Sequence, residues 1–464
     1  MKPQIKRWAA DSSLIPHPSS LLVTRRDLLR RAGKASVTLA AAQLLPPFVL
    51  SGCSKPTGAG TTSVRRAHRE RPTATTIKVG ILHSLTGTMA ISEASLKDVE
   101  LMAIDEINSA GGVLGKQIEV VVEDPESKFS DGFPDKARKL LLDDKVAAVF
   151  GCCTSVSRKN VLPVFEENHS LLFYPVQYEG NECSRYVVYT GATANQQILP
   201  ALDWLLSDKG GGKKKFYLLG SDSIFPRTAN LIVTKYLVSK GLKPVGEVYT
   251  PLGHQEYRKI IRDMRKADPD VIVSTINGDS NISFYNDLAA QGITADKVPV
   301  LAVSVGEDEL RWLDPAKVKG HLAAWNYFQS IKTEKNRAFV RRFQARHGKH
   351  RVTDDRIEAA YITVYFWKQA VERAGSTDVD KVREAFKSGI EFDAPGGNVK
   401  LDPRTQHTFK RFYLGRINET KQFDIVFSTE LIAPVPYPSV AFPGWGCDWT
   451  KGGVIRGEEV KIGM

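Results

Sequence analysis

The sequence has little of what marks several classes of protein. Its 464 residues include only five cysteines, too few for a disulfide-dense scaffold. After residue 55, no apolar run approaches the roughly 18 residues that a membrane-spanning helix needs, which excludes a multi-pass membrane protein. HExxH, GxSxG and P-loop patterns are absent. Hydrophobic residues at 42% and charged residues at 25% instead indicate a globular chain with two or three cores.

Outside the N-terminal segment, basic residues hardly outnumber acidic ones. The net charge is +12, but residues 1–72 hold 13 Lys and Arg against 3 acidic residues, so this segment alone contributes +10. The rest of the chain is therefore close to neutral. A nucleic-acid-binding domain carries its basic surface on the folded domain itself, so nucleic acid is not an expected partner.

The basic N-terminus has the pattern of an export signal. Arg25 and Arg26 form a twin arginine followed by leucines, residues 35–50 are mildly apolar, and Leu-Ser-Gly precedes Cys53. This order is typical of a twin-arginine lipoprotein signal over 1–53, with Cys53 as the lipid-attachment residue. The alternative is a basic tail with a chance cysteine. Residues 54–75 lack an apolar period and predict a flexible tether. The sequence thus predicts a periplasmic protein held at the membrane by its lipid alone.

The remaining cysteines leave their pairing open. Cys152 and Cys153 are adjacent and cannot easily pair with each other, and no Cys or His spacing suits zinc. An oxidising compartment allows a bridge between Cys183 and Cys447, but buried free thiols fit the sequence equally well.

From Thr76 onward, strand and helix patterns alternate. β-branched or continuous apolar runs at 77–82, 117–123, 146–150 and 171–174 predict strands, with helices between them, one of them over 134–143. A second set begins near Asn195, and helices predicted over 335–346, 353–374 and 379–387 then dominate. Two such sets indicate an α/β protein with two doubly wound, Rossmann-like lobes. Ligands of such sheets bind beyond the carboxyl ends of the strands, so a cleft between the lobes is the expected site.

The loops after these strands are polar but poor in catalytic groups. Their hydroxyls, amides and carboxylates suit hydrogen bonding to a small neutral ligand in a closed cavity. The candidates are Ser84, Thr154, Ser155, Tyr174, Gln177, Asp222, Ser223, Asn277 and Asp279. Three of these candidates could instead have purely structural roles. Ser155 is the alternative helix cap, Asp222 the alternative turn residue, and Tyr174 the alternative core residue. No nucleophile and general base occur at the sequence spacing of a known catalytic motif. We therefore predict neither an enzyme nor a cofactor.

Five segments resemble one family of transport proteins. The segments are Thr76–Thr88, Gly151–Lys159, Phe173–Gly180, Asn277–Asn281 and Ala324–Ser330. They look like the urea-binding proteins of urea ABC transporters, within the amide- and branched-chain-amino-acid-binding group. The resemblance covers about Thr76 to Trp449, and Tyr-Pro-Val-Gln-Tyr-Glu-Gly is its most specific run.

The resemblance implies a type I periplasmic binding protein fold, whose two lobes are joined by three crossovers around a ligand cleft. It also implies lobe boundaries. The first lobe takes 76–196 and 325–390, and the second takes 197–324 and 395–464.

The resemblance also implies roles for individual residues. Ser155 matches the family's amide-contacting serine, Tyr174 its aromatic at a strand end, and Val176 and Gln177 enter its pocket. Ser223 departs from the usual tyrosine, and Cys153 stands where an aromatic is common. Both departures enlarge or re-polarise the expected pocket.

The expected function is therefore the capture of urea and its delivery to an inner-membrane ABC permease by hinge closure. Urea presents several N–H donors and one carbonyl, which the polar loops can match. The same fold binding short-chain amides or branched-chain amino acids is the alternative. A ligand-sensing regulator and an amide hydrolase are the hypotheses from other classes.

The export signal is directly testable. We expect the full chain in the membrane fraction, and a chain lacking residues 1–53 in the cytoplasm. Cys53→Ser removes the sulfur that would carry the lipid, so this variant loses membrane attachment, whereas Cys152→Ser keeps it. Fractionation and immunoblotting measure this, and membrane-bound Cys53→Ser would contradict lipidation.

Overall fold

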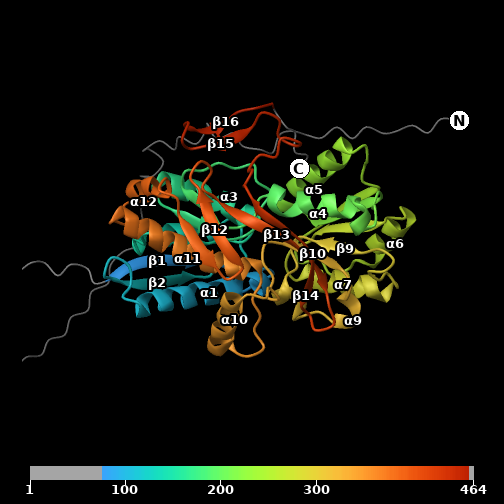
Figure 1. The fold of residues 1–464 in the computed structure, drawn as a ribbon, viewed down its shortest axis with the longest axis horizontal. Coiled ribbons are helices and arrows are strands. Elements are labelled where there is room, and N and C mark those ends of the chain that lie inside the picture. Colours follow the sequence, from blue (N-terminus) through green and yellow to red (C-terminus); the bar gives the residue numbers. More distant parts are fainter. Residues whose placement is uncertain (1–75, 459–464) are drawn as a thin grey trace, which may run out of the picture. The chain divides into compact units, whose positions relative to one another are not determined.

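The computed structural model describes residues 76–458, and these form alternating strands and helices (Figure 1). The signal, the tether and Cys53 lie outside the described residues. The strands are β1 (Thr76–Leu82), β2 (Gln117–Glu123), β3 (Val149–Gly151), β4 (Leu172–Tyr174), β5 (Val187–Tyr189), β6 (Phe216–Ser221), β7 (Gly246–Thr250), β8 (Val271–Thr275), β9 (Val300–Ala302), β10 (Leu322–Trp325), β11 (Glu391–Ala394), β12 (Gly397–Asp402), β13 (His407–Ile417), β14 (Phe423–Ile432), β15 (Gly446–Asp448) and β16 (Gly453–Ile455). The helices are α1 (Ala90–Ser109), α2 (Gly132–Arg138), η2 (Lys139–Asp143), α3 (Ser155–Glu167), α4 (Ala194–Leu206), η3 (Asp208–Gly210), α5 (Ile224–Ser239), α6 (Arg258–Lys266), α7 (Ser280–Ala290), α8 (Glu307–Leu310), α9 (Pro315–Val318), α10 (Glu334–His347), α11 (Asp355–Ala374) and α12 (Val379–Phe386).

The strands form two parallel sets joined by one long strand. The order along the sheet is β2-β1-β3-β4-β5-β13-β10-β9-β8-β6-β7. Within each set neighbours are parallel, as in β1 with β3 and β8 with β9. β13 contacts β5 through His407 and Tyr189, and pairs antiparallel with β10 further along. Figure 1 shows β13 at the junction between the two sets.

Each set of strands has its own hydrophobic core. One core joins residues from Ile77 to Tyr189 with residues from Tyr327 to Leu401, and we call this part the first lobe. Two smaller clusters on the faces of the other set draw on residues from Ala194 to Phe328 and from Phe412 to Cys447, and we call this part the second lobe. The chain passes between the lobes before α4, after β10 and into β13. The lobe boundaries predicted above stay a prediction.

Several elements differ from the sequence-based expectation. The helix expected over 134–143 is α2 followed by a π-helical turn, η2, in which Leu140 and Leu141 are buried. The short buried strand β5 was missed because three apolar residues carry no periodicity. The strand expected over 117–123 coincides with β2.

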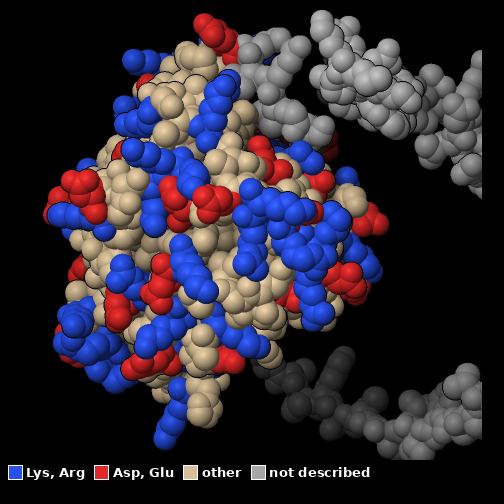
Figure 2. All heavy atoms as spheres, turned by 90° about the vertical axis from the view of Figure 1, so that its right-hand side faces the viewer, with Lys and Arg blue, Asp and Glu red and all other residues tan. Residues whose placement is uncertain are grey.

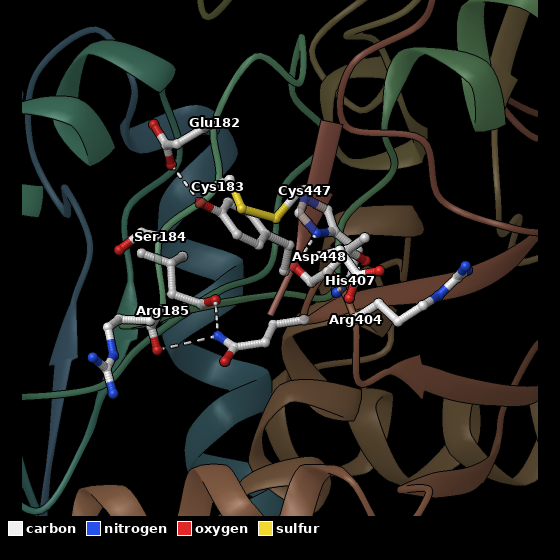
Figure 3. Close-up of a disulfide and its surroundings, with 12 residues drawn as sticks. Glu182, Cys183, Ser184, Arg185, Arg404, His407, Cys447 and Asp448 are labelled. Carbon is white, nitrogen blue, oxygen red and sulfur yellow. Dashed lines mark hydrogen bonds between the residues drawn. A yellow bond between two sulfur atoms is a disulfide. The ribbon is translucent and has the colours of Figure 1, made fainter. Parts of the chain in front are cut away.

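A disulfide connects the C-terminal segment to the loop before β5. Cys183 and Cys447 are bonded, with their Cα atoms 5.6 Å apart and a sequence separation of 264. Figure 3 shows Glu182 and Arg185 beside Cys183, and Asp448 beside Cys447. Backbone bonds reinforce the junction, since the N–H of Asn181 donates to Pro436 O at 2.7 Å. The pairing that the sequence left open is therefore formed, and Cys152 and Cys153 are buried free thiols.

The outer face of the second lobe carries mixed charges. Figure 2 shows many Lys and Arg side chains there, interspersed with Asp and Glu. On α6 the ammonium of Lys259 lies 2.8 Å from the Asp263 carboxylate, and Lys266 lies 2.7 Å from the same residue. Among residues 76–458, no helix combines the length and apolarity needed to cross a membrane.

The disulfide closes a long loop, so its removal should destabilise the fold. We expect Cys183→Ser with Cys447→Ser to lower the free energy of unfolding by about 3–5 kcal/mol, because the unfolded chain regains the entropy of that loop. Urea or guanidinium unfolding followed by circular dichroism measures this. Cys152→Ser is the matched control, and equal midpoints for the double variant and the wild type would contradict the prediction.

Candidate functional site

The loops at the strand ends of both lobes meet around one small cavity of about 20 Å³, large enough for a molecule of only a few non-hydrogen atoms. It is lined by Met89, Ser92, Cys153, Thr154, Ser155, Val176, Gln177, Phe225, Asn277, Gly278 and Arg356. The first lobe contributes the loops after β1, β3 and β4 and the start of α11. The second lobe contributes the loop after β8 and the start of α5.

The two lobes touch closely at Gly278. This residue has φ +68°, and a Cβ there would lie 2.8 Å from Thr88 O and 3.1 Å from Met89 Sδ. Only glycine has both the left-handed conformation and the room for this contact. The turn after β8 therefore closes directly over the loop after β1.

The start of α3 forms one wall of the cavity. Thr154 caps the helix, and its Oγ1 accepts from Ser157 N at 3.1 Å. The hydroxyl of Ser155 donates to Glu179 at 2.5 Å and accepts from Arg158 at 3.2 Å. Its hydrogen is therefore directed to Glu179 and not into the cavity.

A buried charged cluster supports this wall from behind. The guanidinium of Arg158 bonds Glu182 at 2.8 Å and lies 4.7 Å from the ring centroid of Tyr174. Although burial raises the pKa of Glu182, the positive charges of Arg158 and Lys159 lower it to about 2. Tyr174 donates to Cys153 O at 2.6 Å.

Gln177 crosses from the first lobe to the second. Its Nε2 donates to Val303 O at 3.1 Å, while its buried Oε1 has no partner among the described residues. This leaves a hydrogen-bond acceptor at the cavity wall. Asn277 contributes its side chain from the opposite lobe, with its backbone N–H held by Ser221 Oγ at 3.0 Å.

The predicted site residues divide into two groups. Thr154, Ser155, Val176, Gln177 and Asn277 line the cavity. The other five candidates are outside its lining: Ser84, Tyr174, Asp222, Ser223 and Asp279.

These five lie in other places. Ser84 binds Glu93 through its backbone N–H at 2.6 Å. Asp222 and Ser223 line a separate surface groove, where Asp222 pairs with Arg227 at 2.6 Å. Asp279 precedes α7, and burial raises the pKa of its carboxyl.

Sequence reasoning missed Ser92, Phe225 and, above all, Arg356. Gly278 lies within Asn277–Asn281, one of the five segments that carry the family resemblance, so the sequence held a signal for it. Arg356 is a charged residue in the first turn of a helix, a pattern that usually marks solvent exposure, yet it is buried.

Arg356 meets an acidic helix of the second lobe. Its Nη2 donates to Glu309 on α8 and to Asp354 at 3.0 Å. Burial alone would lower the pKa of Arg356, but the two carboxylates raise it above its usual range. On the same helix, Glu307 accepts from Gln329 N at 2.7 Å, and burial followed by repulsion from Asp354 raises its pKa.

Residues 77–442 match the family described as periplasmic binding protein domain. The chain belongs to this family. The expected type I periplasmic binding protein fold is confirmed, and because the family consists of solute-binding proteins, the prediction that the chain is not an enzyme is also confirmed. A binding protein of Pseudomonas aeruginosa for leucine, isoleucine, valine, threonine and alanine is 23% identical over 343 residues, covering 71% of this chain and 87% of that protein.

Two further similarities differ in extent. A solute-binding protein of an ABC transporter from Rhodopseudomonas palustris BisB5, solved with 3,4-dihydroxybenzoic acid, has a TM-score of 0.68 at 20% identity and covers 77% of this chain and 97% of that chain. A protein of Geobacillus stearothermophilus named limonene hydroxylase is 30% identical over 117 residues. The match covers 25% of this periplasmic binding protein and spans about a fifth (21%) of that relative.

Within residues 76–458, no group of His, Cys, Asp and Glu is arranged to hold a metal ion. The site of this periplasmic binding protein is therefore described by its hydrogen-bonding groups. Hydroxyl, amide and guanidinium groups surround the cavity, and none of the residues that line it is acidic.

A buried histidine next to the cavity should make stability depend on pH. His83 lies between Glu100 (3.1 Å) and Glu93 (3.7 Å). Burial lowers its pKa, but the two carboxylates prevail and raise it to about 9. Because this exceeds the 6.5 of an ordinary histidine, the stabilisation is complete below about pH 6.5 and is lost as pH rises through about 9.

We therefore expect the free energy of unfolding to fall by up to about 3 kcal/mol between pH 6.5 and 9.5. His83→Gln should be less stable at pH 7 and show a smaller decline. Denaturant titrations at several pH values measure both, with the exposed His350→Gln as control. An identical pH profile for His83→Gln and wild type would contradict this assignment.

Proposed function

We propose that this protein captures a small neutral amide, urea foremost, and delivers it to an ABC permease of the inner membrane. The observation that carries the proposal is the cavity of about 20 Å³ whose lining contains no acidic residue. An amino acid would need an anion for its ammonium group and more room for its side chain. The relatives that bind branched-chain amino acids or aromatic acids support the transport role, and the cavity favours a smaller ligand.

The hydrogen-bonding groups also suit an amide. Ser92 donates its hydroxyl hydrogen to Glu309 at 2.7 Å, and Ser155 donates its own to Glu179, so both oxygens are acceptors toward other partners. Together with the free Oε1 of Gln177 they make the cavity rich in acceptors. Urea and short-chain amides carry several N–H donors, which need such a lining.

Hinge closure is the proposed mechanism. Gly278 of the second lobe approaches Thr88 of the first, and Gln177 bonds Val303 across the same boundary. A ligand held between these groups favours the closed arrangement because it contacts both lobes at once. The lipid on Cys53, proposed from the sequence, would keep the protein near its permease.

Calorimetric titration of the purified protein with urea, acetamide and leucine tests the proposal. We expect one saturable site for urea with a Kd on the order of 10⁻⁵ to 10⁻³ M, because the best very small ligands gain about 1.5 kcal/mol per non-hydrogen atom. Leucine should give no binding heat.

A pair of variants locates the site. Asn277→Ala should weaken urea binding by about fivefold or more through the loss of one hydrogen-bonding group. Ser223→Ala, in the separate groove, should bind like the wild type. Saturable leucine binding without any urea binding would overturn the ligand assignment.

A further inference from the structure

Arg356 is the one charged residue that lines the cavity in the described part of the chain. It lies in the first turn of α11, and only 4% of its side chain is exposed. Its Nη2 is used by Glu309 and Asp354. Its Nε is buried without a partner, and no hydrogen bond joins its Nη1 to any residue among 76–458. The guanidinium of this cavity-lining residue thus has donors left over.

The charge of this guanidinium is already balanced. Glu309 and Asp354 both accept from it, and its other neighbours, Cys153 and the ring of Trp325, are uncharged. An anion entering the cavity would find a cation that two carboxylates already neutralise. A cation would find the guanidinium itself. A neutral molecule with a strong hydrogen-bond acceptor meets neither penalty.

The remaining cavity groups complement such an acceptor. Gln177 holds its Nε2 on Val303 O, which leaves its Oε1 to accept. The hydroxyl of Ser92 is bound to Glu309, the carboxylate that also binds Arg356. The cavity therefore presents a surplus donor at Arg356 and surplus acceptors at Gln177 and Ser92.

From this arrangement we propose that Arg356 binds the carbonyl oxygen of the ligand while Gln177 and Ser92 accept from its N–H groups. The proposal rests on the function proposed above and deepens it. It names the ligand class as uncharged carbonyl compounds with an adjacent N–H group, and it makes Arg356 a specificity-determining residue. Carboxylates of the same shape are disfavoured because two carboxylates already neutralise Arg356, and a cation such as guanidinium because it offers N–H donors where Arg356 needs an acceptor.

Pairs of molecules with nearly the same shape test this on the wild-type protein. Acetate replaces the amide nitrogen of acetamide by an oxygen, which would face Gln177 Oε1. Guanidinium replaces the carbonyl of urea by an N–H group, which would face Arg356. We expect calorimetry to show acetamide and urea binding at least about tenfold more tightly than acetate and guanidinium, respectively. Acetate binding as tightly as acetamide would overturn the proposal.

Variants of Arg356 provide the second test. Arg356→Met and Arg356→Lys should weaken urea binding by about 10- to 100-fold, the range for a hydrogen bond from a charged donor. Arg342→Met is the matched control, because Arg342 pairs with Glu106 outside the cavity. Thermal unfolding of each variant establishes that it is folded. Arg356→Met leaves Glu309 and Asp354 unpaired. If this variant unfolds, urea binding by Arg356→Lys and the comparison of ligand pairs on the wild-type protein still test the proposal.

The outcomes separate the two proposals. Wild-type protein that binds neither urea nor acetamide overturns the proposed function, and the role of Arg356 with it. Wild-type protein that binds urea while folded Arg356→Met and Arg356→Lys bind it equally well overturns the role of Arg356 alone.

Discussion

Three consecutive carboxylates of α8 are buried where the lobes meet, and their pairing fixes the arrangement of the site. Asp308 accepts from Ser95 on α1, Glu309 from Arg356 on α11, and Glu307 from the backbone after β10. A buried carboxylate without partners costs several kcal/mol, so α8 cannot shift relative to these partners without penalty. Leu310 anchors the same helix in the core of the second lobe. The cavity forms beside this junction.

The polarity of the cavity follows from that junction. Ser92 and Arg356 each use part of their hydrogen-bonding capacity on Glu309 and keep the remainder at the cavity. Likewise, Gln177 uses its nitrogen to hold the second lobe and keeps its oxygen. Groups that hold the lobes together and groups that would hold a ligand are thus the same residues. A substitution that changes one role changes the other.

Local sequence patterns were sufficient for much of the fold. The strand over 117–123 and the helix ending at Ala374 follow from short-range periodicity, and carboxyl ends of parallel strands share an edge, which placed Thr154 and Gln177 near Asn277. Arg356 was not predictable, because its partner Glu309 lies 47 residues away and nothing local distinguishes a buried arginine from an exposed one.

Other misses have the same origin. Asp222 follows a strand as expected, but its side chain turns to Arg227 five residues later and so lies in a separate groove. The bridge between Cys183 and Cys447 spans 264 residues, and only the docking of the C-terminal segment on the first lobe brings the two together. Side-chain direction and long-range contact are properties of packing, which a pattern of neighbouring residues does not contain.

A very small ligand sets a limit on how the lobes can be held together. Because such a ligand contributes at most about 1.5 kcal/mol per non-hydrogen atom, it can shift the balance between open and closed arrangements only if they differ by a few kcal/mol. A large apolar contact between the lobes would exceed that limit. The contacts between the lobes at the cavity include the Arg356–Glu309 ion pair, the hydrogen bond from Gln177 to Val303 and the close backbone approach at Gly278, polar contacts whose partners water can replace on opening. On the function proposed above, charge pairing at the cavity would serve both selectivity and reversibility, since it would favour a neutral ligand and keep closure weak enough to be reversed.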